Sequence, residues 1–591
     1  MGKDVTVIKS NGKRYLGELK EFKDGLPFGI INKRLTDVGG TFVAMNCPCN
    51  YIAVVPFRDL ATSIELDENN KYKVFKMYGG VSKKSFKDYI DESIIKKIAV
   101  TYDSLGKLID WLEEMDEGLN EYKVLVDEYH LILEDLDFRE DAINSVLDLV
   151  VRFPHYSFLS ATPIDTDFEF SFFKQLPHYE LDWGEVQKIT PLKVKTPNVY
   201  KATVNLIEEF QAGLKLDTIN GDIQEVEELH IFINSINGIS QICQTANLKN
   251  EDVRIVCADR IRNNMILDKY NIGSIADKNA KINFYTKKGF QGCNVFSNSA
   301  LVVVVSDARR AHTLVDIETT LVQIVGRIRV NEEFENVFRH KIYHIFSTNK
   351  RIMTDEEFDT FIGGMRDESE AVYIDLMEKD VKLRESYIKM MNFESNFLSV
   401  DGNVVYFNEK KSQLFRYKHN LKKSYKDGLT VRSAYSKSDR FINTNQVYSK
   451  FDDIILTKII DIKLEDLYKM FLEEKDREAY ELEYPEFFEY EKYLEVSEMN
   501  TARWNRQRID KLLHDKKVID FVHQKVSNLA VDFISSADLK VLYGKELKKA
   551  GSDIKPKASM IKENTFLEAE YVNKRVDGIP TRGYNIIKFN N

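Results

Sequence analysis

The segment Val124-Leu125-Val126-Asp127-Glu128-Tyr129-His130 decides the fold class of this chain of 591 residues. Its three consecutive apolar residues indicate a strand buried on both faces, and two carboxylates and a histidine follow directly. An Asp at such a strand tip can help to hold Mg²⁺, and an adjacent Glu can orient an attacking water. An Asp-Glu pair after a strand is common, so it indicates a nucleotide site only in combination with other motifs.

Short apolar runs of the same kind recur along the first 350 residues, and helical patterns separate them. Besides 124–126, they occupy residues 51–55, 98–100, 156–159, 229–233, 253–256, 282–284, 301–305 and 341–346. Strands that alternate with helices predict parallel sheets covered on both faces. We therefore expect an α/β fold with two consecutive units of about 150 residues each.

The composition excludes several classes of protein. Apolar residues make up 43% of the chain and charged residues 30%, a balance typical of a soluble protein with packed cores. Five cysteines are too few for a disulfide framework and fit a reducing cytoplasm. The longest apolar run, 300–305, is too short to cross a bilayer, and no signal peptide is apparent. We expect a cytoplasmic protein that does not contact membranes.

The net charge of −10 conceals an uneven distribution of charged residues. Residues 501–591 contain 18 Lys and Arg against 11 Asp and Glu, and residues 401–440 contain ten against four. In the second stretch, cations are interleaved with aromatic residues, a pattern that suits a single nucleic-acid strand because charges follow phosphates and rings stack on bases. A Lys-rich, solvated helix face explains the pattern equally well.

Two further motifs follow apolar or helical patterns. Ser160-Ala161-Thr162-Pro163 comes directly after an apolar run. Gln323-Ile324-Val325-Gly326-Arg327-Ile328-Arg329 places one glutamine and two arginines at helical spacing. An arginine there suits an arginine finger, a fixed cation beside a γ-phosphate whose charge redistributes during transfer.

These elements, in this order, resemble superfamily 2 helicases of the DEAD/DEAH type. Residues 56–61 and 101–105 are similar to segments with which the family touches the nucleic-acid backbone. Residues 232–235 and 286–294 are similar to second-lobe motifs, with Asn294 where Asp is usual. The compact Gln-x-x-Gly-Arg-x-Arg ending resembles viral origin-binding-protein-like helicases. The resemblance covers roughly residues 28–350 and implies two tandem RecA-like parallel-sheet lobes, with ATP and Mg²⁺ as cofactors.

The resemblance also implies site residues in three groups. Catalytic residues would be Asp127, Glu128, Gln323, Arg327 and Arg329. Residues that bind the nucleotide would be Lys33, Thr36, Gly39, Gly40, Thr41, Gly292 and Asn294, with Thr41 and Asp127 holding Mg²⁺. Residues that contact the strand or couple it to ATP would be Arg58, Thr101, His130, Ser160 and Thr162.

The phosphate loop departs from the family pattern. The family has Gly-x-Gly-Lys-Thr, and this chain has Gly39-Gly40-Thr41, with Gly40 in the place of the lysine. In one interpretation Lys33 folds back over the loop, through turn-tolerant residues, and delivers the ammonium from another backbone position. In the other the site is degenerate, and the protein binds nucleic acid or nucleotide without hydrolysis.

The remaining chain suggests further domains and a biological setting. The expected divisions are 1–180 and 181–350 for the lobes, 351–505 for a helical, basic accessory region, and 506–591 for a winged-helix-like module. That module is similar to those at the ends of phage replication helicases and primases. We expect an ATP-dependent helicase or translocase on DNA, single-stranded or forked, in preference to RNA. The alternative is an ATPase-deficient DNA-binding or scaffolding protein.

The source and partners are expected from composition and resemblance. Many Lys and Tyr residues with few Pro suggest an AT-rich genome, and hence a bacteriophage protein acting in DNA replication or recombination. Its place would be the host bacterial cytoplasm, with replication proteins as further partners.

Overall fold

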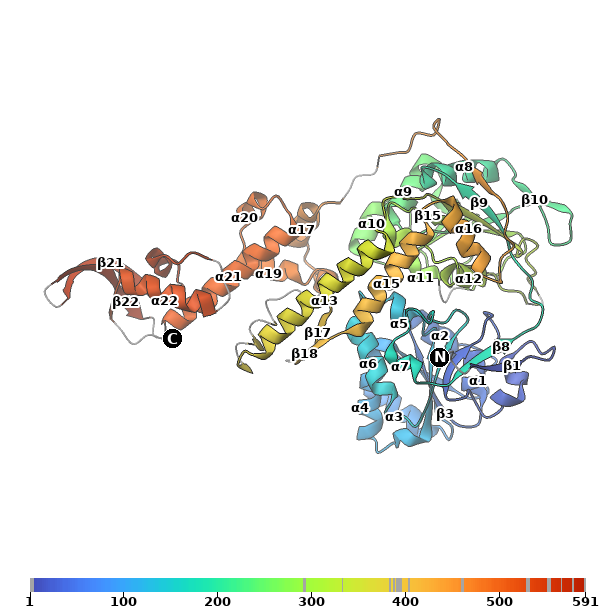
Figure 1. Cartoon of the computed structure of the whole chain (residues 1–591), viewed down its shortest axis with the longest axis horizontal. Coiled ribbons are helices and arrows are strands. Elements are labelled where there is room, and N and C mark those ends of the chain that lie inside the picture. The colour runs from blue at the N-terminus through green and yellow to red at the C-terminus, as the bar shows by residue number, and fades with distance from the viewer. Residues whose placement is uncertain are drawn as a thin grey trace. The chain divides into compact units, whose positions relative to one another are not determined.

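Parallel strands whose side chains are buried on both faces build the two largest sheets of the protein (Figure 1). The computed structural model describes residues 5–290, 294–331, 333–381, 384–385, 388, 396–401, 404–458, 462–527, 532–549, 554–564, 566–576 and 579–588. The chain divides into two units. The first comprises residues 1–259, 263–361 and 409–460, and the second comprises 260–262, 362–408 and 461–591.

The first sheet has eight strands in the order β1-β8-β2-β7-β6-β3-β5-β4, all paired in parallel. Its strands are β1 (Val5–Lys9), β2 (Gly29–Asn32), β3 (Asn50–Val55), β4 (Val74–Met77), β5 (Lys97–Thr101), β6 (Tyr122–Asp127), β7 (His155–Ser160) and β8 (His178–Asp182). Its helices are α1 (Gly40–Asn46), α2 (Arg58–Glu65), α3 (Lys83–Glu92), α4 (Leu105–Glu114), α5 (Leu131–Glu134), α6 (Glu140–Val150) and α7 (Ser171–Lys174).

Continuous apolar runs form these strands because both faces of the sheet are covered. In β6, Val124 and Val126 pack in one cluster with helices α4 and α6, whereas Leu125 packs in another with α1. Successive side chains of a strand point to opposite faces, so each face receives every second residue. The strand therefore needs apolar residues at every position, which is the pattern of the sequence.

The second sheet has seven strands in the order β13-β14-β12-β15-β16-β9-β19, and its neighbouring strands pair in parallel. The strands are β9 (Thr190–Lys195), β12 (Glu228–Phe232), β13 (Val253–Val256), β14 (Ile282–Tyr285), β15 (Ala300–Ser306), β16 (Lys341–Phe346) and β19 (Gln446–Tyr448). Associated elements are α8 (Val199–Gln211), β10 (Lys215–Asp217), β11 (Ile223–Glu225), α9 (Ile236–Thr245), α10 (Ile261–Leu267), α11 (Lys287–Phe290) and α12 (Thr320–Val325).

The basic stretch of residues 401–440 belongs largely to the first unit and is a pair of helices, α15 (Glu409–Ser424) and α16 (Gly428–Lys437). Tyr425 and Tyr435 are fully buried in the core of the second sheet. Lys411 pairs with Glu140, and Lys418 pairs with Asp137. The rings of Tyr425 and Tyr435 are therefore unavailable to stack on bases. For these two tyrosines, the prediction that aromatic residues of the basic stretch stack on a nucleic-acid strand is wrong.

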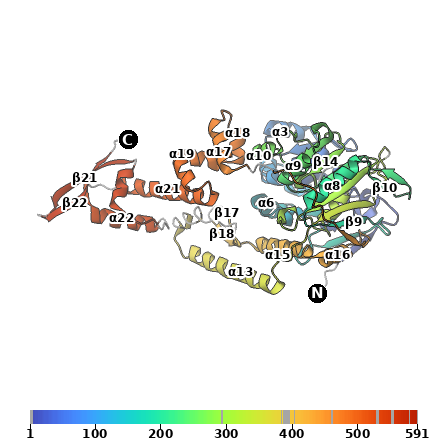
Figure 2. The same cartoon turned by 90° about the horizontal axis from the view of Figure 1, so that it is seen from above.

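The second unit is mostly helical and ends in a small antiparallel sheet (Figure 2). The long helix α13 (Asp355–Met377) enters it from the first unit. The other elements are β17 (Leu398–Asp401), β18 (Val404–Phe407), α17 (Leu464–Glu473), α18 (Glu478–Glu483), α19 (Glu486–Tyr493), α20 (Val496–Thr501), α21 (Arg506–Ser527), β20 (Phe533–Ser535), α22 (Ser536–Lys549), the 3₁₀ helix η7 (Ala558–Glu563), β21 (Leu567–Val576) and β22 (Ile579–Lys588).

The end of the chain follows the expected winged-helix-like order. From α21 onward the elements are helix, strand, helix, short helix and hairpin, and the sheet order is β20-β22-β21. One apolar cluster joins α21, α22, η7 and the hairpin. The fold class predicted from the sequence, two tandem parallel-sheet lobes followed by helices and this module, is confirmed. Among the described residues, no helix has the length and apolar character needed to span a bilayer.

Candidate functional site

The polar residues that follow β2, β6 and β7 lie together because these strands are neighbours. Their order in the sheet is β2-β7-β6, and all three run in the same direction. Lys33 follows β2, Glu128 follows β6, and Ala161 and Thr162 follow β7. Parallel strands bring their carboxyl ends to one edge, which is where α/β sheets bind ligands.

The phosphate loop reverses direction between β2 and α1. Arg34, Asp37 and Gly39 have left-handed backbones, with φ of 54°, 63° and 83°. Gly40 is the first residue of α1 and is buried. A Cβ built on Gly40 would lie 2.2 Å from Cδ2 of Leu159, a fully buried side chain. A lysine at this position, as in the family pattern, would require the buried Leu159 side chain to shift.

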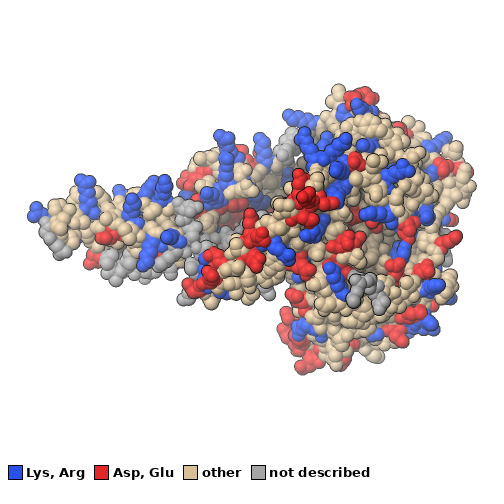
Figure 3. All heavy atoms as spheres, viewed as in Figure 1, with Lys and Arg blue, Asp and Glu red and all other residues tan. Residues whose placement is uncertain are grey.

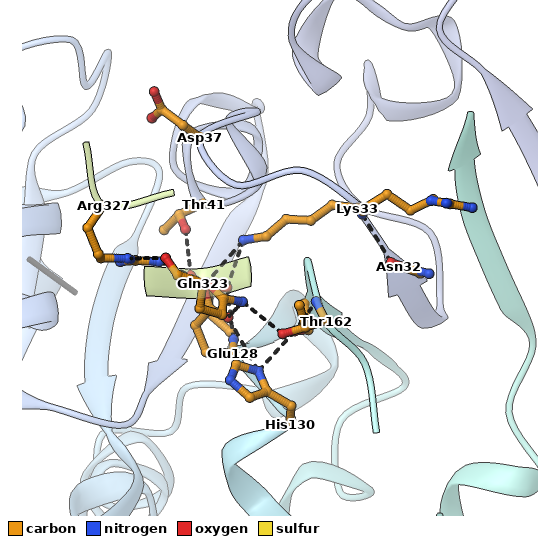
Figure 4. Close-up of polar contacts among 12 residues, drawn as sticks. Asn32, Lys33, Asp37, Thr41, Glu128, His130, Thr162, Gln323 and Arg327 are labelled. Atoms are coloured by element: carbon orange, nitrogen blue, oxygen red, sulfur yellow. Dashed lines mark hydrogen bonds and ion pairs between the residues drawn. The ribbon is translucent and has the colours of Figure 1, made fainter. Parts of the chain in front are cut away.

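Lys33 brings an ammonium to the site from the end of β2 (Figure 4). Its Nζ lies 3.5 Å from Oε1 of Glu128 and 3.9 Å from Oδ1 of Asp127, and the residue is 8% exposed. The indole N–H of Trp183 donates to the Lys33 carbonyl at 2.7 Å and fixes the backbone there. Lys33 thus places its ammonium beside the two carboxylates at the end of β6. Arg34 instead pairs with Glu180 and Asp439, outside this cluster.

Asp127 and Thr41 form the second part of the site. The Thr41 hydroxyl donates to Oδ2 of Asp127 at 2.8 Å, and Asp127 is 7% exposed. Burial raises the pKa of Asp127, and Lys33 opposes that shift without cancelling it. A hydroxyl and a carboxylate side by side are the protein ligands that Mg²⁺ commonly accepts together with phosphate oxygens. The residues therefore fit a magnesium ion bound with a nucleotide.

Glu128 has an unusual backbone. Its φ is 50°, a left-handed conformation that is uncommon for non-glycine residues and concentrated at functional sites. Its N–H donates to Oδ1 of Asp127 at 2.9 Å. Burial alone would raise the pKa of Glu128, but Lys33, followed by His130 and Arg327, outweighs burial and lowers it. Glu128 is therefore an ionised carboxylate at neutral pH.

A chain of hydrogen bonds joins the two lobes at Glu128 (Figure 4). The Gln323 amide nitrogen donates to Oε2 of Glu128 at 3.1 Å and to Oγ1 of Thr162 at 3.0 Å. The Thr162 N–H donates to Oγ of Ser160 at 3.0 Å, and that hydroxyl contacts Nδ1 of His130 at 2.9 Å. Burial lowers the pKa of His130 to about 4, so its ring is neutral at pH 7.

The two arginines of the second lobe occupy different positions. The Arg327 guanidinium donates to Oε1 of Gln323 at 2.8 Å and to the Gln323 carbonyl at 2.9 Å. Arg329 donates to Oδ1 of Asn294 at 2.7 Å and lies 3.7 Å from Oδ1 of Asp37 in the phosphate loop. Arg327 thus orients Gln323, and Arg329 links the second lobe to the loop.

Several of these groups line one cavity of about 260 Å³. Among the residues that line it are Lys33, Thr36, Asp37, Gly39, Gly40, Thr41, Asp127, Glu128, Asn294, Arg327 and Arg329. Among the described residues, no group of three or more His, Cys, Asp and Glu could hold a metal by itself. A cation here would need ligands from outside the protein, as a nucleotide's phosphates supply.

Two other predicted site residues, Thr101 and Arg58, lie away from the cavity, and a third lies outside the described residues. Thr101 ends β5 and its hydroxyl donates to Ser104, while exposed Arg58 lies over the Tyr78 ring. Neither belongs to the hydrogen-bond chain at Glu128. Gly292 lies outside the described residues.

Three further residues contribute to the site without having been predicted from the sequence. Gly326 approaches the loop so closely that an added Cβ would lie 2.1 Å from Oγ1 of Thr36. Asp37 pairs with Arg329, and Leu159 packs against Gly40. The short apolar run Ile30-Ile31, followed by Asn32-Lys33, is a signal for β2 of the same kind as the one that located β6.

Comparison with solved structures finds helicases and a related enzyme. The Mycobacterium smegmatis helicase Lhr bound to ssDNA and AMP-PNP is 15% identical over 54% of this chain and 44% of its own, with a TM-score of 0.36. S. cerevisiae Dbp5 bound to RNA and ADP BeF3 is 13% identical, over 56% and 81%, with a TM-score of 0.36. The ATP-dependent Type ISP restriction-modification enzyme LlaBIII bound to DNA is 13% identical, over 92% and 39%, with a TM-score of 0.37.

The chain matches less than half the length of Lhr. No protein-family model and no curated protein matches the sequence. At these identities and TM-scores the likeness gives no information about activity, so the site itself must carry the functional argument.

Proposed function

We propose that the chain is an ATP-dependent motor of the helicase type that moves along nucleic acid. One observation carries the proposal: a cation, a hydroxyl and two carboxylates from one lobe share a cavity with two arginines from the other, and a glutamine of that second lobe donates to one of the carboxylates. Nucleotide hydrolases of the two-lobed kind need these groups, and they need them from both lobes, so that closure completes the site.

Each side chain has a role in this proposal. Lys33 neutralises charge on the β- and γ-phosphates in place of the missing loop lysine. Thr41 and Asp127 hold Mg²⁺, which bridges phosphate oxygens and neutralises their developing charge. Glu128, kept ionised, orients the attacking water.

The second lobe senses the nucleotide through Gln323. Its amide contacts both Glu128 and Thr162, and Arg327 holds its orientation. Closure or opening of the lobes changes these contacts. In the proposal, Ser160, Thr162 and His130 pass that change from the nucleotide to the nucleic-acid strand, with Arg58 and Thr101 as strand contacts.

A nucleic acid, with DNA preferred to RNA, is the proposed partner, and the charge of the C-terminal module supports binding to such a polyanion. Residues 501–591 carry seven more cations than anions, since 18 Lys and Arg oppose 11 Asp and Glu. On the face seen in Figure 3, the charged side chains of this region are mainly Lys and Arg. Basic surfaces bind polyanions through release of counterions. The composition supports a bacteriophage protein that acts in replication or recombination in the host cytoplasm, with other replication proteins as partners.

A DNA-stimulated hydrolysis assay tests the proposal. Purified protein with ATP and Mg²⁺ should release phosphate, and single-stranded DNA should increase the rate. Glu128→Gln should bind nucleotide but lose hydrolysis. The control Glu180→Gln, which changes a carboxylate outside the cavity, should keep both nucleotide binding and hydrolysis. If the wild-type protein binds DNA but hydrolyses nothing, the chain is instead an ATPase-deficient DNA-binding or scaffolding protein, which the glycine at position 40 favours.

A further inference from the structure

Two cysteines lie together just after α1, the helix that begins in the phosphate loop. Helix α1 ends at Asn46, and Cys47-Pro48-Cys49 connects it to β3. The N–H of Cys49 donates to the Cys47 carbonyl at 2.9 Å, which makes a γ-turn centred on Pro48. The proline ring holds φ near the value that an inverse γ-turn has. The turn therefore keeps the two cysteines close in space.

The two thiols are in direct contact. Their Sγ atoms lie 3.0 Å apart, and either thiol can donate a hydrogen bond to the other. Cys47 is buried, whereas Cys49 is half-buried and follows the exposed Pro48. Two cysteines can be bridged only where their side chains already approach each other, and this pair meets that requirement. A disulfide between them would need only local movement.

A buried lysine of β5 faces the pair. The Lys97 ammonium donates to the carbonyls of Ala44 and Cys47 at 2.7 and 2.8 Å, and it lies 3.5 Å from Sγ of Cys47. Burial lowers the pKa of Lys97, and the negative charge of Cys47 opposes that shift. The ammonium is therefore held at the end of α1, where it can stabilise a thiolate.

These contacts favour one thiolate within the pair. The hydrogen bond with Cys49 is the largest effect and lowers the pKa of Cys47; burial opposes it, and Lys97 lowers the pKa further. The same hydrogen bond raises the pKa of Cys49, so the pair keeps one shared proton. By contrast, burial raises the pKa of Cys257 to about 11. Because thiolates are the reactive form of cysteine, the pair is more reactive than Cys257.

The surroundings of the pair do not suit a metal ion. Two cations, Lys97 and Lys123, act on Cys49, and they would repel a metal cation. Structural zinc sites use four ligands, and the described residues contain no group of three or more His, Cys, Asp and Glu that could hold a metal. The geometry favours thiol chemistry over metal binding.

We propose that Cys47 and Cys49 form a reversible dithiol–disulfide pair that reacts with low-molecular-weight disulfides such as glutathione disulfide. Cys49, after passing its proton to Cys47, attacks one sulfur of glutathione disulfide and releases a glutathione thiolate, which takes the proton from Cys47. The Cys47 thiolate then attacks Sγ of Cys49 and releases a second glutathione thiolate. The pair loses two electrons, which glutathione disulfide gains.

Lys97 is a positioning residue that stabilises the reduced state of the pair. Closing the disulfide removes the thiolate and leaves the buried ammonium without its anionic neighbour, which costs free energy. A disulfide is reduced more easily when its reduced form is stabilised in this way. The pair is therefore a dithiol in a reducing cytoplasm and closes when the proportion of glutathione disulfide rises.

A redox titration of the full chain tests the pair. The protein is equilibrated at a series of ratios of glutathione disulfide to glutathione, blocked with an alkylating agent and analysed by peptide mass spectrometry. As the ratio rises, the peptide with residues 47–49 should lose both alkyl groups and become lighter by two hydrogen atoms, and dithiothreitol should reverse this. Cys49→Ser should form no such bridge, whereas the control Cys243→Ala, which changes a buried cysteine on α9, should titrate like the wild type.

Lys97→Gln tests the role of the lysine, because glutamine keeps a hydrogen-bond donor and removes the charge. The equilibrium constant for disulfide formation should rise about tenfold, the worth of a hydrogen bond to a charged group, which makes the reduction potential more negative by about 30 mV. A changed Tm with an unchanged potential would overturn the role of Lys97. Retention of both alkyl groups at every ratio in the wild type, or a bridge from either cysteine to another one, overturns the pair itself, whether or not Lys97→Gln folds.

Discussion

Lys33 is the residue on which the proposed chemistry depends most. Its ammonium lies 3.5 Å from Glu128, within the cavity that Thr41 and Gly39 also line. Transfer of the γ-phosphoryl group moves charge that a nearby cation must stabilise. We expect Lys33→Ala to abolish phosphate release, while the control Lys84→Ala, an exposed lysine on α3, keeps it. Wild-type turnover in Lys33→Ala would show that Lys33 has no part in hydrolysis.

Position 40 gives a second prediction at the residue scale. From the sequence alone, Gly40→Lys should restore hydrolysis to Lys33→Ala. The structure corrects this expectation, because a Cβ at position 40 would lie 2.2 Å from Cδ2 of Leu159 in the core. We now expect Gly40→Lys to lower Tm and not to rescue Lys33→Ala. Adding Leu159→Ala should recover part of the folding of Gly40→Lys; recovery of activity without it would contradict the packing argument.

Arg327 and Gln323 act together in the hydrogen-bond chain. We expect Arg327→Ala to lower hydrolysis by about 10³-fold with nucleotide binding largely intact, as loss of an arginine finger does. Because Arg327 holds Gln323 at 2.8 Å, the double variant with Gln323→Ala should lose less than the sum of the two single effects. Turnover and nucleotide affinity, measured on all three variants, check this. Full turnover in Arg327→Ala would remove the two-lobed mechanism.

At the scale of elements, α15 and α16 are part of the first unit and not a free basic surface. Tyr425 and Tyr435 fill the core of the second sheet, and Lys411 pairs with Glu140 of α6. Deleting residues 401–591, the change that the sequence suggests as a test of DNA binding, would remove this core. Such a truncation should unfold the second lobe, so it cannot report on DNA contacts.

A shorter truncation tests the basic C-terminal module. Deleting residues 462–591 leaves α15, α16 and β19 in the first unit. DNA binding should weaken. The slope of log K against the logarithm of the salt concentration should become less steep by about 0.9 per lost phosphate contact for duplex DNA and by about 0.7 for single strands. Binding measured from low to moderate salt, with Tm as the control for folding, checks this. An unchanged slope would assign the phosphate contacts to the first unit.

At the scale of the whole molecule, stability should depend on pH through a carboxyl between the lobes. Burial raises the pKa of Glu134 to about 7, and Lys287 opposes the shift. Glu134 ends α5 in the first lobe, and the Thr320 hydroxyl of the second lobe donates to it at 3.4 Å. The folded state therefore holds this proton at pH values where the unfolded chain has released it.

The sign of the pH effect follows from that difference. A carboxyl whose pKa is raised by folding stabilises the protein at low pH and loses that contribution as pH rises from about 4.5 towards 7. We expect the Tm of the wild type to fall over this range relative to Glu134→Gln, which cannot titrate. Parallel Tm curves for the two proteins from pH 5 to 8 would show that Glu134 ionises normally.

The sequence by itself determined the two-sheet architecture. Apolar runs such as 124–126 and 301–305 are continuous because each strand is buried on both faces, and no tertiary information is needed to recognise them. Each run that we predicted corresponds to a strand of one of the two parallel sheets. The strand β2 was missed, although the residues that follow it, including Lys33, were recognised as a candidate phosphate-binding segment.

Only the tertiary structure decided which cation serves the site and which basic residues are structural. Distances between β2, β6 and α12 depend on strand order and lobe closure, which residue spacing does not encode. Lys33 and Arg34 are adjacent in the sequence, and the structure separates their side chains: Lys33 faces Glu128, whereas Arg34 pairs with Glu180. Likewise, the burial of Tyr425 and the solvent-shielded guanidinium of Arg440 come from packing between segments far apart in the chain, which no local pattern records.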